Sequence, residues 1–282
     1  MPGATVGVYS TPARIAAGML VAISRASAPG ILALVVLAND PPITTPALVT
    51  LTTLFALAPA FAAWLLAWRA RATLSLTDAA LVVRGRGLRI EIPCASIGAV
   101  EPWVIPLPGV GLSLRMRSGR RLQYGFQVDN PTTLLGALAD VAGVEAARAV
   151  ADHASVVYAH AKKGVAPRRW YHGFGKFVAF ALLPTLVLFN LHQHIAYGGT
   201  FGEYYLLGFA SFVRTFVIYW GTVSIYLVLY AGTWRVAAEG VALAAAWVAP
   251  SRAARVRRMV EIGCRLAYYG GVPLLLALRF LA

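Results

Sequence analysis

The chain has 282 residues and a formal net charge of +14, and 59% of its residues are hydrophobic while only 13% are charged. Soluble globular domains average about 45–50% apolar and about 25% charged residues, so this composition argues against an ordinary soluble domain. The excess of apolar residues predicts a chain that crosses a lipid bilayer.

Five apolar stretches have about the 17 to 25 residues that a membrane-spanning helix requires. In chain order they are Ile15 to Leu37, Ala47 to Trp68, Phe177 to Ile195, Tyr204 to Tyr230 and Leu266 to Ala282. The first contains Arg25 and Pro29 and could instead be an interfacial helix followed by a re-entrant segment, and the short fifth could lie on the membrane surface. The sequence therefore predicts four or five transmembrane helices.

The basic residues are distributed unevenly among the connecting segments. Fifteen of the 25 lie between Arg69 and Lys176 and six more between Arg235 and Arg265, whereas the connections 38–46 and 196–203 have none. Lys and Arg close to spanning segments are retained on the cytoplasmic side. We therefore expect the N-terminus and the middle of the chain to be cytoplasmic. The positive charge then reflects topology, and no nucleic-acid partner is expected.

Apolar and polar residues alternate between the second and third spans, as they do in strands that bury one face. Strands are predicted over Thr73–Thr77, Ala80–Arg84, Leu88–Ile92, Ile97–Ile105, Val110–Arg117 and Arg121–Val128. Gly87 and Gly119 fall at the predicted turns. Asn130 and Pro131 favour the start of a helix that continues over residues 132–141. The middle of the chain is therefore predicted to be an antiparallel β domain closed by a helix.

These residues resemble the bacterial pleckstrin-homology-like domain of small membrane proteins. The resemblance is carried by Leu-Thr-Asp-Ala-Ala-Leu-Val-Val (76–83), Ile-Pro-Cys-Ala-Ser-Ile (92–97), the Ser-Gly turn (118–119) and the closing Asn-Pro helix. It covers residues 71–143, about a quarter of the chain. It implies a bent seven-stranded sheet, as a sandwich or barrel, capped by one helix. It does not imply phosphoinositide binding, because domains of this type serve widely as interaction modules.

Seven arginines gather around the two predicted hairpins of this domain. They are Arg84, Arg86, Arg89, Arg115, Arg117, Arg120 and Arg121. A domain tethered near an anionic leaflet gains about 1 kcal/mol for each basic residue at the surface. This group is therefore a candidate surface for anionic lipid or a partner protein, and the alternative is a solvated surface that only sets the orientation.

Two further basic stretches follow the β domain and the fourth predicted span. Residues 147–176 are predicted to be a linker helix and a basic juxtamembrane segment. Residues 252–265, after the break at Pro250, are predicted to form a basic amphipathic helix on the inner leaflet, where Arg255 and Arg258 would contact lipid or a partner.

Arg25 and Arg214 are the unusual residues of the predicted spans. A charge near the bilayer centre costs at least ~2.5 kcal/mol, so each arginine needs an anionic or dipolar partner or a route to the surface. None of the five stretches contains Asp or Glu, and only Asp40 and Glu203 lie at their outer edges. We therefore expect one or both arginines to contact a partner subunit, a lipid head group or another anion, unless they bond backbone carbonyls or snorkel.

His192, His194 and Glu203 lie near the outer ends of the third and fourth spans. Histidines two residues apart point in different directions on a helix, so they could share a metal ion only where the helix frays. A metal or haem site there is an alternative, and no cofactor is predicted. The chain also lacks the common nucleotide-binding, hydrolase and zinc-protease motifs, which argues against an enzyme.

The sequence predicts an α+β membrane protein in six segments. They are a helix pair (1–68), the cytoplasmic β domain (69–146), a linker (147–176), a second helix pair (177–232), an amphipathic segment (233–265) and a short hydrophobic helix (266–282). We expect a non-catalytic accessory, assembly or scaffolding protein of a bacterial inner membrane, with membrane lipids and another membrane protein as partners. The alternative is a metal-, haem- or quinone-binding subunit that uses His192, His194, Glu203 and Arg214.

Overall fold

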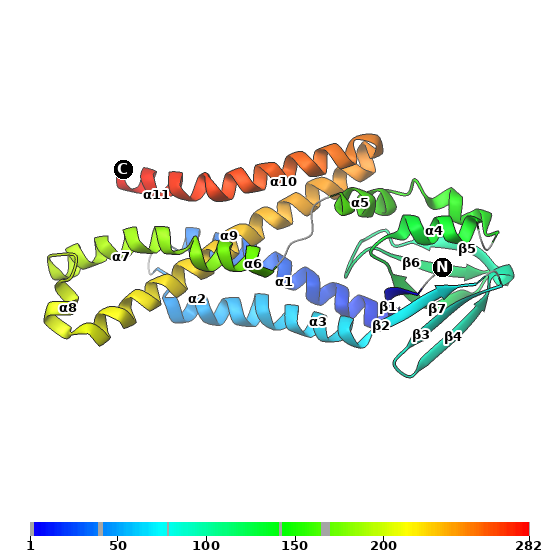
Figure 1. Cartoon of the computed structure of the whole chain (residues 1–282), viewed down its shortest axis with the longest axis horizontal. Coiled ribbons are helices and arrows are strands. Elements are labelled where there is room, and N and C mark those ends of the chain that lie inside the picture. Colours follow the sequence, from blue (N-terminus) through cyan, green and yellow to red (C-terminus); the bar gives the residue numbers. More distant parts are fainter. Residues whose placement is uncertain (1–2, 39–41, 78, 141–142, 165–169, 282) are drawn as a thin grey trace. The chain divides into compact units, whose positions relative to one another are not determined.

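The structure is a computed structural model that describes residues 3–38, 42–77, 79–140, 143–164 and 170–281. The chain forms two compact units. The first comprises Met1–Arg25, Leu54–Ala166 and Ala237–Glu261, and the second comprises Ala26–Thr53, Pro167–Val236 and Ile262–Ala282. The first unit carries a β-sheet, and the second is built from helices (Figure 1).

The sheet of the first unit has seven strands, and each strand is antiparallel to its neighbours. The strands are β1 (Ala4–Ser10), β2 (Arg71–Leu76), β3 (Ala80–Gly85), β4 (Leu88–Pro93), β5 (Ile97–Pro102), β6 (Gly111–Met116) and β7 (Arg121–Gln127). Their order across the sheet is β4-β3-β2-β1-β7-β6-β5. Gly87 and Gly119 have positive φ angles in the turns after β3 and β6, a conformation that glycine adopts without strain. The alternating pattern predicted β2 to β7 to within three residues.

Strand β1 is the central strand of the sheet, and it lies outside the segment whose alternating pattern predicts strands. Its first half pairs with β2 and its second half with β7, and Gly7 is opposite both Arg71 and Gln127. The alternation in the middle of the chain therefore specifies only six of the seven strands. The single sheet also differs from the predicted sandwich or barrel.

One face of the sheet is covered by helix α4 (Pro131–Asp140), as Figure 1 shows. Leu134, Leu135 and Leu138 of α4 pack with inward residues of the strands in one apolar core. Asn130 precedes the helix, and its Oδ1 accepts a hydrogen bond from the Thr132 hydroxyl. The predicted closing helix is thus present, with Pro131 at its first position.

Two short helices follow α4 in the segment that is predicted to hold a linker helix. A 3₁₀ segment (Glu145–Val150) is followed by α5 (Ala154–Lys163), and His153 caps α5 by accepting a hydrogen bond from the Ser155 backbone N–H. Small residues of α5 then pack against α9 (Phe209–Val248) and the first turns of α10 (Ala253–Tyr269). Ala159, Ala242 and Ala253 meet at this contact, where their small side chains allow the backbones to approach closely.

Four helical stretches are long and apolar enough to cross a membrane, which indicates a membrane protein. They are α1 (Thr11–Leu37), the stretch Thr45–Arg69, the stretch Tyr171–Tyr197, and α9. Thr45–Arg69 comprises α2 (Thr45–Leu51), a π-helical segment (Thr52–Leu57) and α3 (Ala58–Arg69), and Tyr171–Tyr197 lies in α6 (Trp170–Phe174), a π-helical segment (Gly175–Ala179) and α7 (Leu182–Tyr197). At most 22% of the residues in the most apolar part of each stretch are buried within the protein. Their exposed apolar side chains are therefore available to lipid.

Two predicted spans differ from the observed helices. The fourth is divided at Gly208 into α8 (Gly202–Leu207) and α9, and α9 continues to Val248 through residues assigned to the amphipathic segment. The fifth is not one helix, because α10 ends at Tyr269 and α11 (Gly271–Leu281) follows. Gly270 separates the two helices, and a Cβ atom there would lie 2.9 Å from the carbonyl oxygen of Leu266.

The second unit has two apolar clusters of its own. Ala28, Ile31, Leu48 and Leu229, from three of the candidate spans, form one cluster. The other joins Ala181 and α9 to Tyr268 and Val272. A Cβ atom on Gly232 would lie 2.8 Å from Cβ of Ala28, so two spans approach closely through small residues there.

Candidate functional site

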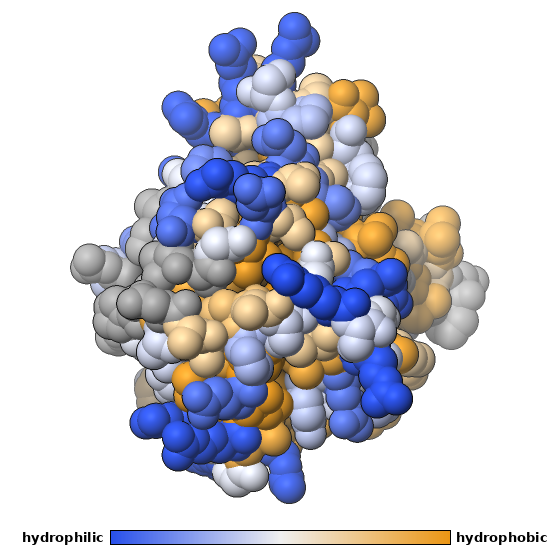
Figure 2. Space-filling model, turned by 90° about the vertical axis from the view of Figure 1, so that its right-hand side faces the viewer, coloured by the Kyte–Doolittle hydropathy of each residue, from blue (hydrophilic) through white to orange (hydrophobic). Residues whose placement is uncertain are grey.

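All seven arginines predicted to form a basic surface are exposed on the first unit. Figure 2 looks onto the side of the molecule that carries the sheet, where hydrophilic side chains are spread over the surface. Three of the arginines belong to the β3–β4 hairpin and four to the β6–β7 hairpin. The two hairpins differ in how their charges are compensated.

Arginines are directly opposite each other in both hairpins. Arg115 is paired in register with Arg121, and both form ion pairs with Glu101 of β5, at 2.7 and 2.9 Å. Arg84 is opposite Arg89 in the other hairpin. Among the described residues, no carboxylate pairs with Arg84 or Arg89. Like charges directly opposite in a sheet are unfavourable, so the β3–β4 hairpin carries an uncompensated pair of positive charges.

The turn of the β3–β4 hairpin contacts the end of a candidate span. The guanidinium carbon of Arg86 lies over the Trp68 ring, 4.0 Å from its centroid. Trp68 is the last residue but one of α3. Tryptophan is enriched where spanning helices meet the membrane surface. This contact therefore brings the uncompensated arginines to the end of a stretch that is long and apolar enough to cross a membrane.

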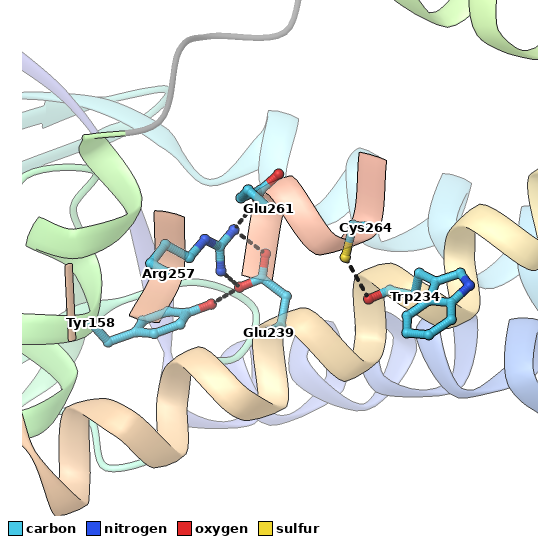
Figure 3. A network of polar contacts seen from close by, with 6 residues as sticks. All are labelled: Tyr158, Trp234, Glu239, Arg257, Glu261 and Cys264. Atoms are coloured by element: carbon cyan, nitrogen blue, oxygen red, sulfur yellow. Dashed lines mark hydrogen bonds and ion pairs between the residues drawn. The ribbon is translucent and has the colours of Figure 1, made fainter. Parts of the chain in front are cut away.

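A second polar group, which the sequence analysis did not identify, is buried in the first unit (Figure 3). Arg257 of α10 is only 1% exposed and donates hydrogen bonds to the carboxylates of Glu239 in α9 and Glu261 in α10. The hydroxyl of Tyr158 in α5 also donates to Glu239. The network therefore ties three helices together by charge-assisted hydrogen bonds.

Burial and charge act in opposite directions on this network. Burial alone lowers the pKa of Arg257, but the hydrogen bond and charge of Glu239 and the charge of Glu261 outweigh it and raise the pKa. Burial raises the pKa of Tyr158, and the hydrogen bond to Glu239 raises it further. Arg257 therefore stays charged and Tyr158 stays protonated, so the two remain donors at neutral pH.

The two arginines predicted inside spans have different surroundings. Arg25 in α1 is exposed and lines a pocket of the first unit. Arg214 in α9 is exposed in the second unit and has no ion pair with another described residue. Of the two acids expected to answer these charges, Asp40 lies outside the described residues, and Glu203 bonds other side chains. The acid inside a candidate span is Glu239, and its partner is Arg257.

Glu203 is buried at the start of α8, between α7 and α9. Its carboxylate accepts hydrogen bonds from Gln193 (2.7 Å), Ser211 (2.8 Å) and Thr215 (2.6 Å). Burial raises the pKa of Glu203, but these three hydrogen bonds and the nearby His192 together bring it below its ordinary value. The site therefore holds an ionised carboxylate by neutral donors, which closes the turn between two candidate spans.

The residues of the alternative cofactor site come together only in part, because His192 lies near Glu203 while His194 is bonded elsewhere. The ring of His192 packs 5.1 Å from the ring of Tyr219, whereas His194 is exposed with Nδ1 2.9 Å from the carbonyl oxygen of Asn190. Within the part of the chain that the structure describes, no three His, Cys, Asp or Glu side chains form a group that could hold a metal ion.

Helix α10 buries a different face from the one its sequence suggests. Arg255 and Arg258 are exposed, as expected for residues that contact lipid or a partner, and Met259 is exposed beside them. Its first buried residues are Ala253, Arg257 and Glu261, spaced four apart.

No family model matches the chain, and the searches of curated proteins and of solved structures found no similar protein.

Proposed function

We propose that the protein is a non-catalytic accessory, assembly or scaffolding protein of a bacterial inner membrane, whose sheet binds anionic lipid head groups on the cytoplasmic side. The observation that carries the proposal is the uncompensated pair Arg84 and Arg89 on a hairpin whose turn contacts Trp68. An anionic head group offers these arginines the negative charge that Glu101 supplies to Arg115 and Arg121.

The lipid role is favoured over a partner protein because of where the hairpin is anchored. Arg86 holds its turn against the end of α3, and each basic residue near an anionic surface contributes about 1 kcal/mol. The cytoplasmic orientation is supported by the concentration of basic residues in 69–176 and 235–265. A partner membrane protein would then be held close to the lipid that the hairpin contacts.

The sheet and α4 are proposed to be a pleckstrin-homology-like domain. The seven antiparallel strands and the helix that packs on one face support this assignment. The domain begins with β1, so its first strand and the rest of its strands are separated in sequence by the first two spans.

The proposal is tested with the full-length protein in nanodiscs that contain phosphatidylglycerol and phosphatidylcholine. Arg84→Gln/Arg89→Gln removes the two uncompensated charges, and we expect the preference for phosphatidylglycerol, counted by native mass spectrometry, to fall by about tenfold or more at low salt. Arg117→Gln/Arg120→Gln is the matched control, because it removes two exposed arginines from the other hairpin. Equal preference in both variants and in the unmodified protein would contradict the proposal.

A further inference from the structure

The first unit contains a pocket of about 300 Å³, and no residue of the β3–β4 hairpin lines it. It is lined by one face of α1, one face of α3 and residues of the sheet domain, including Arg25, Ala60, Ala63, Tyr9 and Gln127. Its volume is at the lower end of the range for small-molecule sites, about 300–1,000 Å³. This is enough for a head group and the first carbons of a chain.

The wall of the pocket on α3 is apolar and made mostly of small side chains. Ala60, Ala63 and Ala67 follow each other at intervals of three and four residues and so lie on one face of the helix. The hydroxyl of Ser24 donates a hydrogen bond of 2.8 Å to the carbonyl oxygen of Ala56, which holds α1 beside the π-helical segment that precedes α3. Small residues on α3 therefore leave a groove along two stretches that could span a membrane.

The polar end of the pocket combines a positive charge with groups of the sheet domain. None of the residues that line it is acidic. Gln127 lines the pocket, and its buried Oε1 has no hydrogen-bond donor among the described residues. Burial raises the pKa of Tyr9, so its phenol remains a protonated donor. The pocket thus places a cation beside an apolar groove, and its lining includes Tyr9, which is buried, and Gln127, whose Oε1 is buried.

We propose that this pocket binds one anionic phospholipid, whose phosphate pairs with the guanidinium of Arg25 and whose acyl chain follows the alanine groove of α3. A guanidinium in a candidate span is costly unless an anion answers it, and it binds phosphate through two parallel hydrogen bonds.

A lipid fits this pocket better than a soluble anion because of where the pocket lies. Arg25 and Ala60 belong to the stretches Thr11–Leu37 and Thr45–Arg69, so its walls would be reached from the bilayer. The inference rests on the membrane placement in the proposed function, but it concerns different residues from the β3–β4 hairpin. The two lipid contacts can therefore fail separately.

The test measures the phospholipid that stays bound when the full-length protein is purified in detergent. Arg25→Gln removes the charge, and Ala60→Leu fills the groove at an exposed position without changing the charge. Arg214→Gln is the matched control, because it removes an exposed arginine from another candidate span. We expect the unmodified protein and Arg214→Gln to retain one phosphatidylglycerol per chain. Arg25→Gln and Ala60→Leu should bind this lipid with an affinity that is lower by a factor of about ten or more.

Other outcomes would separate the two proposals or overturn this one. Arg84→Gln/Arg89→Gln should keep the tightly bound lipid even if it loses its preference for phosphatidylglycerol in nanodiscs. Equal retention by Arg25→Gln, Ala60→Leu and Arg214→Gln would overturn the pocket as a lipid site. If inorganic phosphate displaced the bound lipid at a concentration similar to that of competing phosphatidylglycerol, the apolar groove would contribute nothing to binding. The assignment to a lipid would then be wrong.

Discussion

Arg257 donates two parallel hydrogen bonds to the carboxylate of Glu239, from Nη1 to Oε2 at 2.9 Å and from Nη2 to Oε1 at 3.0 Å. Nη2 also donates to Oε1 of Glu261 at 2.9 Å. A lysine has no planar pair of donors and cannot reproduce this geometry. The fork of Arg257 therefore fixes α10 against α9 within the first unit.

Removing Arg257 should strongly destabilise the protein. Arg257→Leu would leave the carboxylates of Glu239 and Glu261, which are 13% and 8% exposed, buried without the guanidinium between them. Breaking such a pair costs about 3–5 kcal/mol, measurable by unfolding in detergent. Arg258→Leu, at an exposed neighbouring position, should change the free energy of unfolding by only about 0.5 kcal/mol. Equal effects of the two substitutions would argue against the network.

The sheet packs so closely around Trp103 that one glycine should not tolerate a methyl group. A Cβ atom on Gly111 would lie 2.6 Å from Trp103 and 2.7 Å from the carbonyl oxygen of Phe126. Gly111→Ala should therefore cost about 1–3 kcal/mol of stability. Gly136→Ala in α4, where nothing lies within 4 Å, should instead stabilise by about 0.5–1 kcal/mol. Denaturation curves of the two variants that shifted in the same direction would count against this packing.

Acid should destabilise the protein through Glu203. Because its folded-state pKa is lowered, Glu203 contributes stability above the ordinary glutamate pKa of about 4.3, and this contribution is lost as the pH falls through the folded pKa. The melting temperature of the unmodified protein should fall as the pH drops below about 4.3. Glu203→Gln should be less stable at neutral pH and lose part of this dependence. If the melting temperatures of the unmodified protein and of Glu203→Gln changed with pH in parallel, Glu203 would not be held ionised in the folded protein.

The cofactor alternative makes a different prediction for purified protein. If His192, His194, Glu203 and Arg214 formed a metal or haem site, elemental analysis and absorption spectra would show one equivalent that His192→Ala/His194→Ala removes. The proposed function predicts the same sub-stoichiometric content in both proteins. A stoichiometric signal lost in the double variant would reverse the ranking of the two functions.

Local patterns predicted the parts of the fold that depend on neighbours in sequence. Alternation and turn glycines located β2 to β7, and Asn130 and Pro131 marked the start of α4. Strand β1 escaped prediction because its partners, β2 and β7, follow two spans later, and nothing within seven residues reveals such a pairing. The length of α9 was missed because its alanine-rich end looks like a boundary in composition.

The polar sites also combine features that the sequence predicts with contacts that depend on the fold. The basic residues of the hairpins were visible as a cluster, but their compensation by Glu101 depends on strand register. Arg257 was hidden among Arg255 and Arg258 in a basic helix, and only the packing of α10 on α9 brings it to Glu239. The pocket beside Arg25 likewise requires the sheet domain and two spans together.

The side of the membrane on which the sheet lies can be determined by labelling an introduced cysteine. Ser118→Cys places a thiol in the exposed β6–β7 turn, with Cys264→Ala to remove the partly exposed native thiol and buried Cys94 retained. We expect a membrane-impermeant thiol reagent to label this protein in inverted inner-membrane vesicles and to leave it unlabelled in intact spheroplasts. Labelling in intact spheroplasts would place the sheet outside the cytoplasm and contradict the proposed function.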